Sequence, residues 1–270
     1  MLEALLGGLF GLLIGSFLNV CIYRMPRDLS VVSPRSACPF CDKQIVWYDN
    51  IPIVSFFLLM GRCRHCKEPI SWRYAAVELV TGVLFFAAVW KFGVTLLALK
   101  FCIFAAIQID LIFTDFEERI LPDEFTLGGT VAGLVLAAFI PMSPGLVALL
   151  LPVDWNHVFI SVMEAAVGAM FTAGILWGFG ALYKKLRHRE GLGFGDVKMV
   201  MMIGAFFGIQ GTLLTLIIGS VLGSVAGLTY ILLKKEDAAT YELPFGSFLG
   251  IAALGVALWG SSVLSWYGRF

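Results

Sequence analysis

The sequence predicts an all-α membrane protein that crosses the bilayer about eight times and carries one small extramembrane domain. Hydrophobic residues make up 59% of the 270 residues, and charged residues make up only 14%. A soluble domain has about 25% charged residues, so this chain has too few to cover a water-facing surface. Its apolar residues also gather in runs of the length that a membrane helix needs, roughly 20 residues. The 29 glycines suit helices that pack closely in lipid.

Eight apolar segments are the candidate membrane helices. The first has no basic stretch before it and no small-residue cleavage site, so we expect a retained span rather than a signal peptide. The sixth is short and opens directly from a glycine-rich loop. The segments are 3–23, 75–93, 96–114, 125–142, 158–182, 197–209, 211–233 and 245–267.

The basic residues predict the orientation of these spans. Lys and Arg gather in the connecting segments 24–74, 183–196 and 234–244, whereas 143–157 is almost free of them. Eight crossings place the three basic segments on one side, together with 115–124. Basic connections stay in the cytoplasm, so we expect this side to be cytoplasmic and both termini to lie outside. The formal net charge of zero gives no indication of a nucleic-acid partner.

Four of the six cysteines form two C-x-x-C pairs inside 24–74, Cys38/Cys41 and Cys63/Cys66. Two such pairs, 21 residues apart, fit a tetrahedral four-thiolate zinc site with a structural role. The reducing cytoplasm disfavours disulfides. A segment this small nevertheless needs a cross-link, such as a metal site, to fold. The alternative is a pair of dithiols without metal. The other two cysteines, Cys21 and Cys102, lie in apolar runs, where we expect them to pack.

Two aspartates stand at the edges of predicted spans, where ionisable residues are candidates for function. Asp115 ends the third span, and Asp196 lies in Gly-Leu-Gly-Phe-Gly-Asp-Val-Lys at the start of the sixth. Taken singly, each is explained as a helix cap or as a solvated charge. The predicted topology, however, places both on the cytoplasmic edge. Two carboxylates that meet near a low-dielectric boundary cannot both ionise easily, so one can activate water while the other holds a proton.

These residues belong to an ordered set of motifs along nearly the whole chain. The set runs from Gly15-Ser16-Phe17-Leu18-Asn19 through the two C-x-x-C pairs, Glu78-Leu79, Asp115 before Pro122-Asp123, and Gly193-Phe194-Gly195-Asp196-Val197-Lys198 to Pro244-Phe245-Gly246. In this order the motifs resemble the bacterial type IV prepilin peptidases, also called prepilin leader peptidase/N-methyltransferases. Where that family often has Pro-Phe-Gly-Pro, this chain has Ser247 in the last position. We expect no effect of this change on the chemistry.

The resemblance implies that Asp115 and Asp196 are the catalytic pair of a membrane aspartyl protease, with Gly193, Gly195 and Lys198 in its active-site loop. It implies removal of a basic leader from prepilins and pseudopilins, after a glycine, at the cytoplasmic face of the bacterial inner membrane. It also implies that the new N-terminal residue is then methylated with S-adenosylmethionine. Glu78 is a candidate residue for that second step, and the residues that bind S-adenosylmethionine are not indicated.

We therefore divide the chain into a first transmembrane helix (1–23), a cytoplasmic four-cysteine zinc domain (24–74) and a membrane-embedded aspartyl peptidase domain (75–270). Three alternatives remain at this point. The chain could be a peptidase without methyl transfer, or a membrane methyltransferase in which both aspartates are dispensable. It could also be a zinc-ribbon membrane protein or a small transporter, although a transporter should have more polar residues in mid-membrane.

Overall fold

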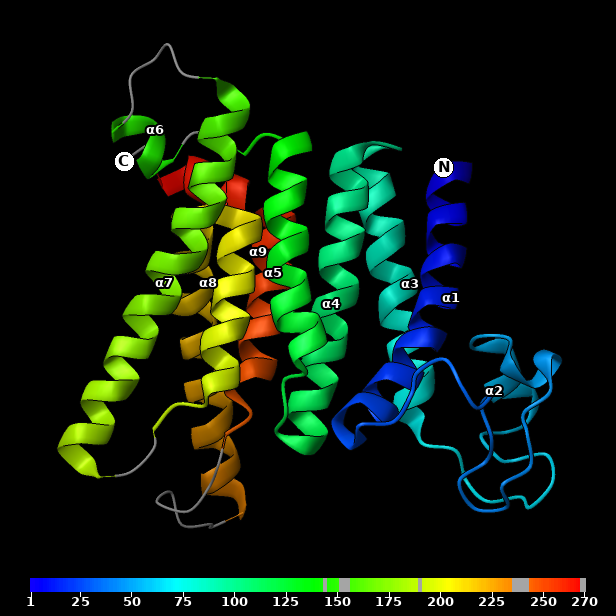
Figure 1. The fold of residues 1–270 in the computed structure, drawn as a ribbon. Helices are drawn as coiled ribbons and strands as arrows, with labels where there is room; N and C mark the ends of the chain where they lie inside the picture. Colours follow the sequence, from blue (N-terminus) through cyan, green and yellow to red (C-terminus); the bar gives the residue numbers. More distant parts are fainter. Residues whose placement is uncertain (143–144, 151–155, 189–190, 235–242, 268–270) are drawn as a thin grey trace. The chain divides into compact units, whose positions relative to one another are not determined.

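The computed structural model describes residues 1–142, 145–150, 156–188, 191–234 and 243–267, with side chains as far as residue 260 (Figure 1). Helices are the only extended regular elements of these residues, which confirms the predicted all-α class. The long ones are α1 (Leu2–Arg24), α3 (Trp72–Phe92), α4 (Leu96–Glu118), α5 (Asp123–Phe139), α7 (His157–Arg187), α8 (Phe194–Lys234) and α9 (Phe245–Tyr267). The short ones are η1 (Met25–Arg27), η2 (Trp47–Asn50), α2 (Val54–Leu58) and α6 (Leu146–Leu150).

Five helices in the described part of the chain are long and apolar enough to cross a membrane, namely α1, α3, α4, α7 and α8. Each predicted span coincides largely with a helix, and the spans 197–209 and 211–233 share α8. The count of eight crossings therefore stays a prediction. Much of the predicted connection 234–244, and parts of 143–157 and 183–196, lie outside the described residues.

The chain folds as two compact units, Met1–Asp110 and Leu111–Phe270. In the first unit, α1 packs against α3 so closely that the contact positions require glycine. A side chain at Gly15 would come within 2.7 Å of the Cα atom of Glu78. One helical turn further on, the side-chain amide of Asn19 donates a hydrogen bond to the carbonyl oxygen of Tyr74 at 3.0 Å. Backbones that approach this closely gain packing contacts along the whole pair.

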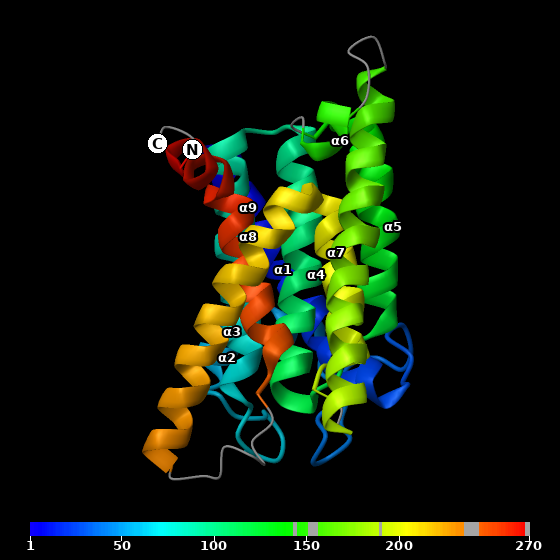
Figure 2. The ribbon, with the colours of Figure 1, turned by 90° about the vertical axis from the view of Figure 1, so that its left-hand side faces the viewer.

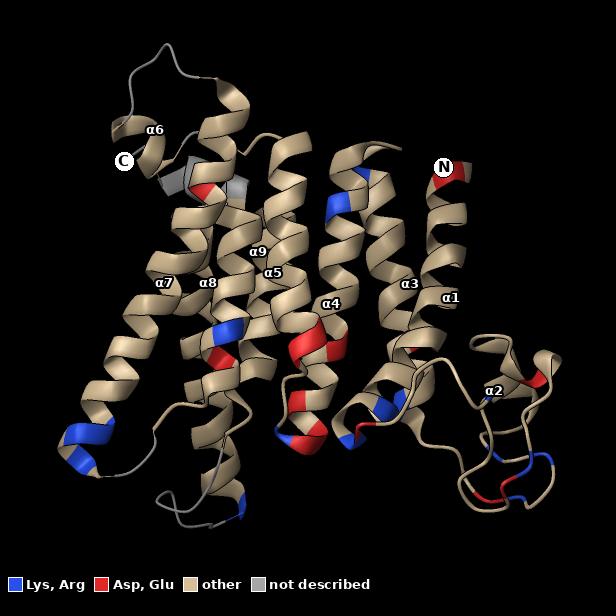
Figure 3. Ribbon diagram, in the orientation of Figure 1, with Lys and Arg blue, Asp and Glu red and all other residues tan. Residues whose placement is uncertain are grey.

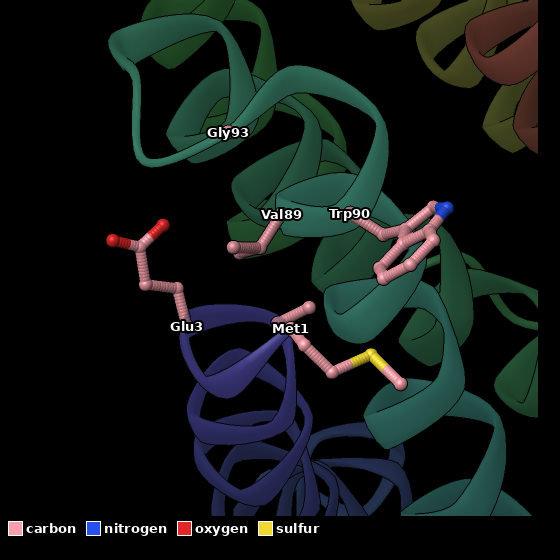
Figure 4. Close-up of a pocket in the computed structure, with 6 residues that line it drawn as sticks. Met1, Glu3, Val89, Trp90 and Gly93 are labelled. Atoms are coloured by element: carbon pink, nitrogen blue, oxygen red, sulfur yellow. The ribbon is translucent and has the colours of Figure 1, made fainter.

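A pocket of about 260 Å³ opens between the first residues of α1 and the last turn of α3 (Figure 4). Met1, Glu3, Val89 and Trp90 contribute to its lining. None of the site residues predicted from the sequence lines it.

In the second unit, α8 is two helices joined at Gly208 (Figure 2). The first half begins with Gly195 beside Leu121 and ends with Gly208 beside Glu164. The second half runs back toward the level at which α8 begins. Its Gly227 lies beside Leu243, which precedes Pro244 and the start of α9. The backbone of Gly208 has φ +66° and ψ −170°, a conformation that only glycine adopts readily. The predicted connection near residue 210 is therefore a single glycine and not a loop.

Glu164, to which the sequence assigned no role, is 3% exposed in α7 and holds the start of α6. Its Oε1 accepts hydrogen bonds from the backbone N–H groups of Gly145, Val147 and Ala148 at 2.8, 2.8 and 3.1 Å. These are donors that a helix leaves unpaired at its N-terminus. The carboxylate thus fixes the connection between α5 and α7.

We predict that Gly208→Ala destabilises the protein by about 1–3 kcal/mol, because alanine is strained at this φ and ψ. The free energy of unfolding in detergent measures the effect. Gly174→Ala is the matched control, because Gly174 lies in α7 with open space where a side chain would stand. Equal stability of the two variants would show that the chain reverses without strain at Gly208.

Candidate functional site

Asp115 lies in the last turn of α4 and is 6% exposed. The backbone N–H of Ser247 donates a hydrogen bond to its Oδ2 at 2.6 Å, and the Ser247 Oγ stands 2.8 Å from the same oxygen. That Oγ also lies 3.0 Å from the carbonyl oxygen of Ile112. The start of α9 is therefore fastened to the end of α4 at this carboxylate. Ser247, which the sequence analysis expected to be without effect, contacts the candidate residue directly.

Asp196 lies in the first turn of α8 and is partly exposed. Its carboxylate accepts a hydrogen bond from the backbone N–H of Gly193. A side chain at Gly193 would come within 3.2 Å of the Asp196 Oδ2, so glycine lets the loop backbone close on the carboxylate.

Leu121 connects the surroundings of the two aspartates. A side chain at Gly195 would lie 3.2 Å from Leu121, and one at Gly246 would lie 3.2 Å from Leu121 and 3.1 Å from the carboxyl carbon of Asp115. Asp115 and Asp196 are themselves near enough for direct Coulomb repulsion. The fold thus brings together the two carboxylates that the sequence places 81 positions apart.

Lys198 forms an ion pair with Asp123, which joins the first turn of α8 to the first turn of α5. The Lys198 side chain is 18% exposed and that of Asp123 is 57% exposed. Most of the acidic residues that the structure describes in the second unit lie in the same region, at the lower ends of α4 and α5 and near the first turn of α8 (Figure 3). The family resemblance implied a place for Lys198 in the active-site loop but no role of its own for Asp123.

The four cysteines of the first unit converge on one point. Their Sγ atoms all lie within 4.8 Å of one another, and those of Cys38 and Cys66 are 3.7 Å apart. A tetrahedral zinc ion with Zn–S bonds of about 2.3 Å requires S–S separations of about 3.8 Å. The donor set therefore fits zinc. Among the described residues, the group contains these cysteines and not His65.

Each C-x-x-C pair sits in the same kind of turn. The backbone N–H of Cys38 donates to the carbonyl oxygen of Lys43 at 3.0 Å, and that of Cys63 donates to Glu68 at 2.9 Å. The residue after each second cysteine has a positive φ, 55° at Asp42 and 63° at Lys67. Two local turns of the same kind therefore bring the four thiols to one point.

The surroundings of these thiols shift the pKa values of Cys63 and Cys66 in opposite directions. Hydrogen bonds from the backbone of Cys66 and of His65 lower the pKa of the Cys63 thiol to about 6. The backbone of Glu68 also lowers the pKa of Cys66. Burial and hydrogen bonds to the other thiols outweigh that effect, and the pKa of Cys66 is raised to about 12. The Cys63 thiol thus ionises more readily than the Cys66 thiol, and a cation bound by both would displace the Cys66 proton.

Glu78 is 8% exposed in α3 and faces the segment that carries the cysteines. Its Oε2 accepts a hydrogen bond from the backbone N–H of Ile53 at 2.7 Å, and Ser16 contributes a side-chain hydrogen bond. Ile53 has φ +63°, which is rare for a β-branched residue. The structure thus gives Glu78 a positioning contact, and a role in methyl transfer stays a prediction.

We predict one zinc ion per chain, measured by plasma mass spectrometry of the purified protein. Cys66→Ser should remove the metal and speed amide hydrogen exchange throughout 38–68, because this small segment lacks another staple. Cys102→Ser is the matched control, since this buried cysteine lies in α4 outside the cluster. Full zinc content in Cys66→Ser would contradict the four-thiolate site.

Two family models match the chain. The description "Bacterial Peptidase A24 N-terminal domain" covers residues 9–92, and "Type IV leader peptidase family" covers residues 102–228. The matched regions contain the cysteine cluster and both aspartates, respectively.

Curated proteins named prepilin leader peptidase/N-methyltransferase are similar over nearly the whole chain. The Aeromonas hydrophila protein is 34% identical over 96% of this chain and 91% of its own length. The Pseudomonas aeruginosa protein is 32% identical over 97% and 92%. The Myxococcus xanthus protein is 39% identical over 82% of this chain and 61% of its own length. No solved structure shows a significant match.

Proposed function

Because the chain belongs to the type IV leader peptidase family, we propose that it removes the basic leader from prepilins and pseudopilins by aspartyl-protease chemistry. The observation that carries this proposal is the approach of Asp115 and Asp196, each held by a backbone N–H group. The cut would follow a glycine at the cytoplasmic face of a bacterial inner membrane. The apolar helices support a location in the membrane.

We assign the base to Asp115 and the proton donor to Asp196. Hydrogen bonds that point at a carboxylate favour its charged form, and Ser247 directs both its N–H and its hydroxyl toward Asp115. Asp115 then takes a proton from a water molecule that attacks the scissile carbonyl carbon. Asp196 donates its proton to the carbonyl oxygen. As the C–N bond breaks, Asp115 passes the proton it took from water to the leaving amine, and Asp196 regains a proton from a hydroxyl of the tetrahedral intermediate. The reaction uses only water and the two carboxyl groups.

The acidic surface beside the pair suits a basic leader. Glu117 is exposed two residues after Asp115, and Glu124 is exposed in the first turn of α5 beside Asp123, whose carboxylate pairs with Lys198. Opposite charges steer a substrate and fix its register more than they add affinity. We propose that this surface receives the leader while the apolar part of the substrate stays among the helices.

A second activity follows from the names of the relatives, which are also N-methyltransferases. S-adenosylmethionine would supply the methyl group for the new N-terminal amine. Glu78, the candidate residue for this step, is already bonded to Ile53 and Ser16. The residues that the structure describes thus do not define a site for S-adenosylmethionine. We propose that zinc holds 24–74 folded in its role as the cytoplasmic domain.

We predict that Asp115→Asn and Asp196→Asn each lower cleavage at least about 100-fold, the usual contribution of a positioned acid or base. The assay uses the full-length protein in liposomes, a prepilin with a basic leader and a Gly-Phe junction, and mass spectrometry of the product. The product mass also shows whether S-adenosylmethionine adds a methyl group.

Asp110→Asn is the matched control, because Asp110 lies five residues before Asp115 in α4 and is fully buried. It should retain cleavage as long as the protein stays folded, which zinc content and gel filtration verify. Cleavage near the unmutated rate by either Asp115→Asn or Asp196→Asn would refute the assignment. An unshortened, methylated substrate would favour a methyltransferase without peptidase activity.

We predict that Ser247→Ala lowers kcat about tenfold with little change in KM, because one hydrogen bond to a charged group is lost. Ser247→Thr keeps both donors and should stay within a few-fold of the unmutated enzyme. An unchanged rate in Ser247→Ala would show that the Ser247 hydroxyl does not position Asp115.

A further inference from the structure

The short helix α2 presents its apolar face outward. Val54, Phe57 and Leu58 are 50%, 60% and 77% exposed. Their spacing of three and four residues places them on one side of the helix, whereas Ser55 and Phe56 on the other side are buried. A helix that bordered only water would have the opposite arrangement.

α2 is held firmly in this orientation. The Phe56 ring packs under Gly61, where a side chain would come within 3.1 Å of it, and its centroid is 4.9 Å from that of Trp72. The Ser55 Oγ donates a hydrogen bond to the carbonyl oxygen of Tyr48 at 2.8 Å. The backbone N–H of Ile53, directly before the helix, donates to Glu78. The exposure of the apolar face is therefore a fixed feature of the first unit.

Trp72 joins this face to a candidate membrane span. It is the first residue of α3, is 69% exposed, and its ring is 6.3 Å from that of Phe57. Leu79, Val83 and Trp90 follow it along one line of α3, at 54%, 55% and 60% exposure. A span in lipid places such a line against the acyl chains, with tryptophan at the interface.

We propose that Val54, Phe57, Leu58, Met60 and Trp72 form a membrane-interface anchor, which seats the cysteine-containing segment on the leaflet where α3 begins. α2 lies at the level of the last turns of α1 and the first turns of α3 in both views (Figures 1 and 2). The exposed line of α3 thus meets α2 where the Trp72 ring contacts Phe57.

Basic residues stand at the borders of this anchor. Arg62 is exposed two residues after Met60, and Arg73 directly follows Trp72. Arginine beside an apolar interfacial surface reaches the phosphates of anionic lipids. The occupant that fits both the apolar face and its basic border is therefore a leaflet with anionic headgroups. This inference needs only that α3 spans a membrane and is independent of the proposed peptidase activity.

The test uses the full-length protein in phosphatidylcholine vesicles that contain a phosphatidylglycerol with a photoreactive diazirine high on one acyl chain. After irradiation, mass spectrometry locates the labelled residues. We expect Phe57, Leu58 and Met60 to be labelled as strongly as Leu79, and at least about tenfold more than the exposed Phe40 beside the cysteines. When phosphatidylcholine carries the diazirine instead of phosphatidylglycerol, this labelling should fall about fivefold. That is the enrichment of an anionic lipid that one basic residue supplies.

Leu58→Asp should reduce the labelling of Phe57 and Met60 without loss of zinc, whereas Val32→Asp at another exposed position should not. Label on α3 with none on 54–60 would overturn the proposal. Loss of that label on adding a prepilin would make the face a substrate-docking surface instead. Loss of the label at high protein density would assign the face to contact with a second copy.

Discussion

A carboxylate inside a helix bundle must accept hydrogen bonds, because an unpaired buried charge is strongly destabilising. In this chain, buried carboxylates on three long helices take those bonds from backbone N–H groups of segments that lie outside their own helix. The pairs are Asp115 with Ser247, Glu164 with Gly145, Val147 and Ala148, and Glu78 with Ile53. Each of these hydrogen bonds therefore fixes the position of a connecting segment as well as that of the carboxylate.

This arrangement makes the candidate active site depend on α9. Asp115 is supplied by α4, but its orientation is set by the first residues of α9 through Ser247. Asp196 is oriented instead by its own loop through Gly193. The two carboxyls thus meet only when three separate elements have reached their places. A pair assembled in this way is preorganised, which is the condition under which charged groups act most effectively in catalysis.

The membrane class, the helices and the cysteine cluster could be predicted from the sequence because each depends on local patterns. Apolar runs define spans, and a C-x-x-C turn aims its two thiols without help from distant residues. The contact of Ser247 with Asp115 spans 132 residues, and that of Lys198 with Asp123 spans 75. No periodicity or spacing encodes such pairs. They follow from tertiary packing alone.

Two further features lacked a signal for a different reason. The reversal at Gly208 takes a single residue, so there is no polar loop to mark it within the apolar sequence. The outward face of α2 extends over five residues, too few for an amphipathic period to stand out beside the apolar runs around it. In both cases the structural element is shorter than the window in which a sequence pattern becomes recognisable.

The repetition of the cysteine turns has a consequence for how this segment can change over evolutionary time. Both turns use the same pair of backbone bonds, and each supplies half of the ligands. Neither half can hold a metal in a closed tetrahedral site alone. Selection therefore acts on the four thiols as one indivisible trait, because losing any of them removes the benefit of the other three. A lineage that abandons the metal should discard the whole quartet and replace it with another source of rigidity.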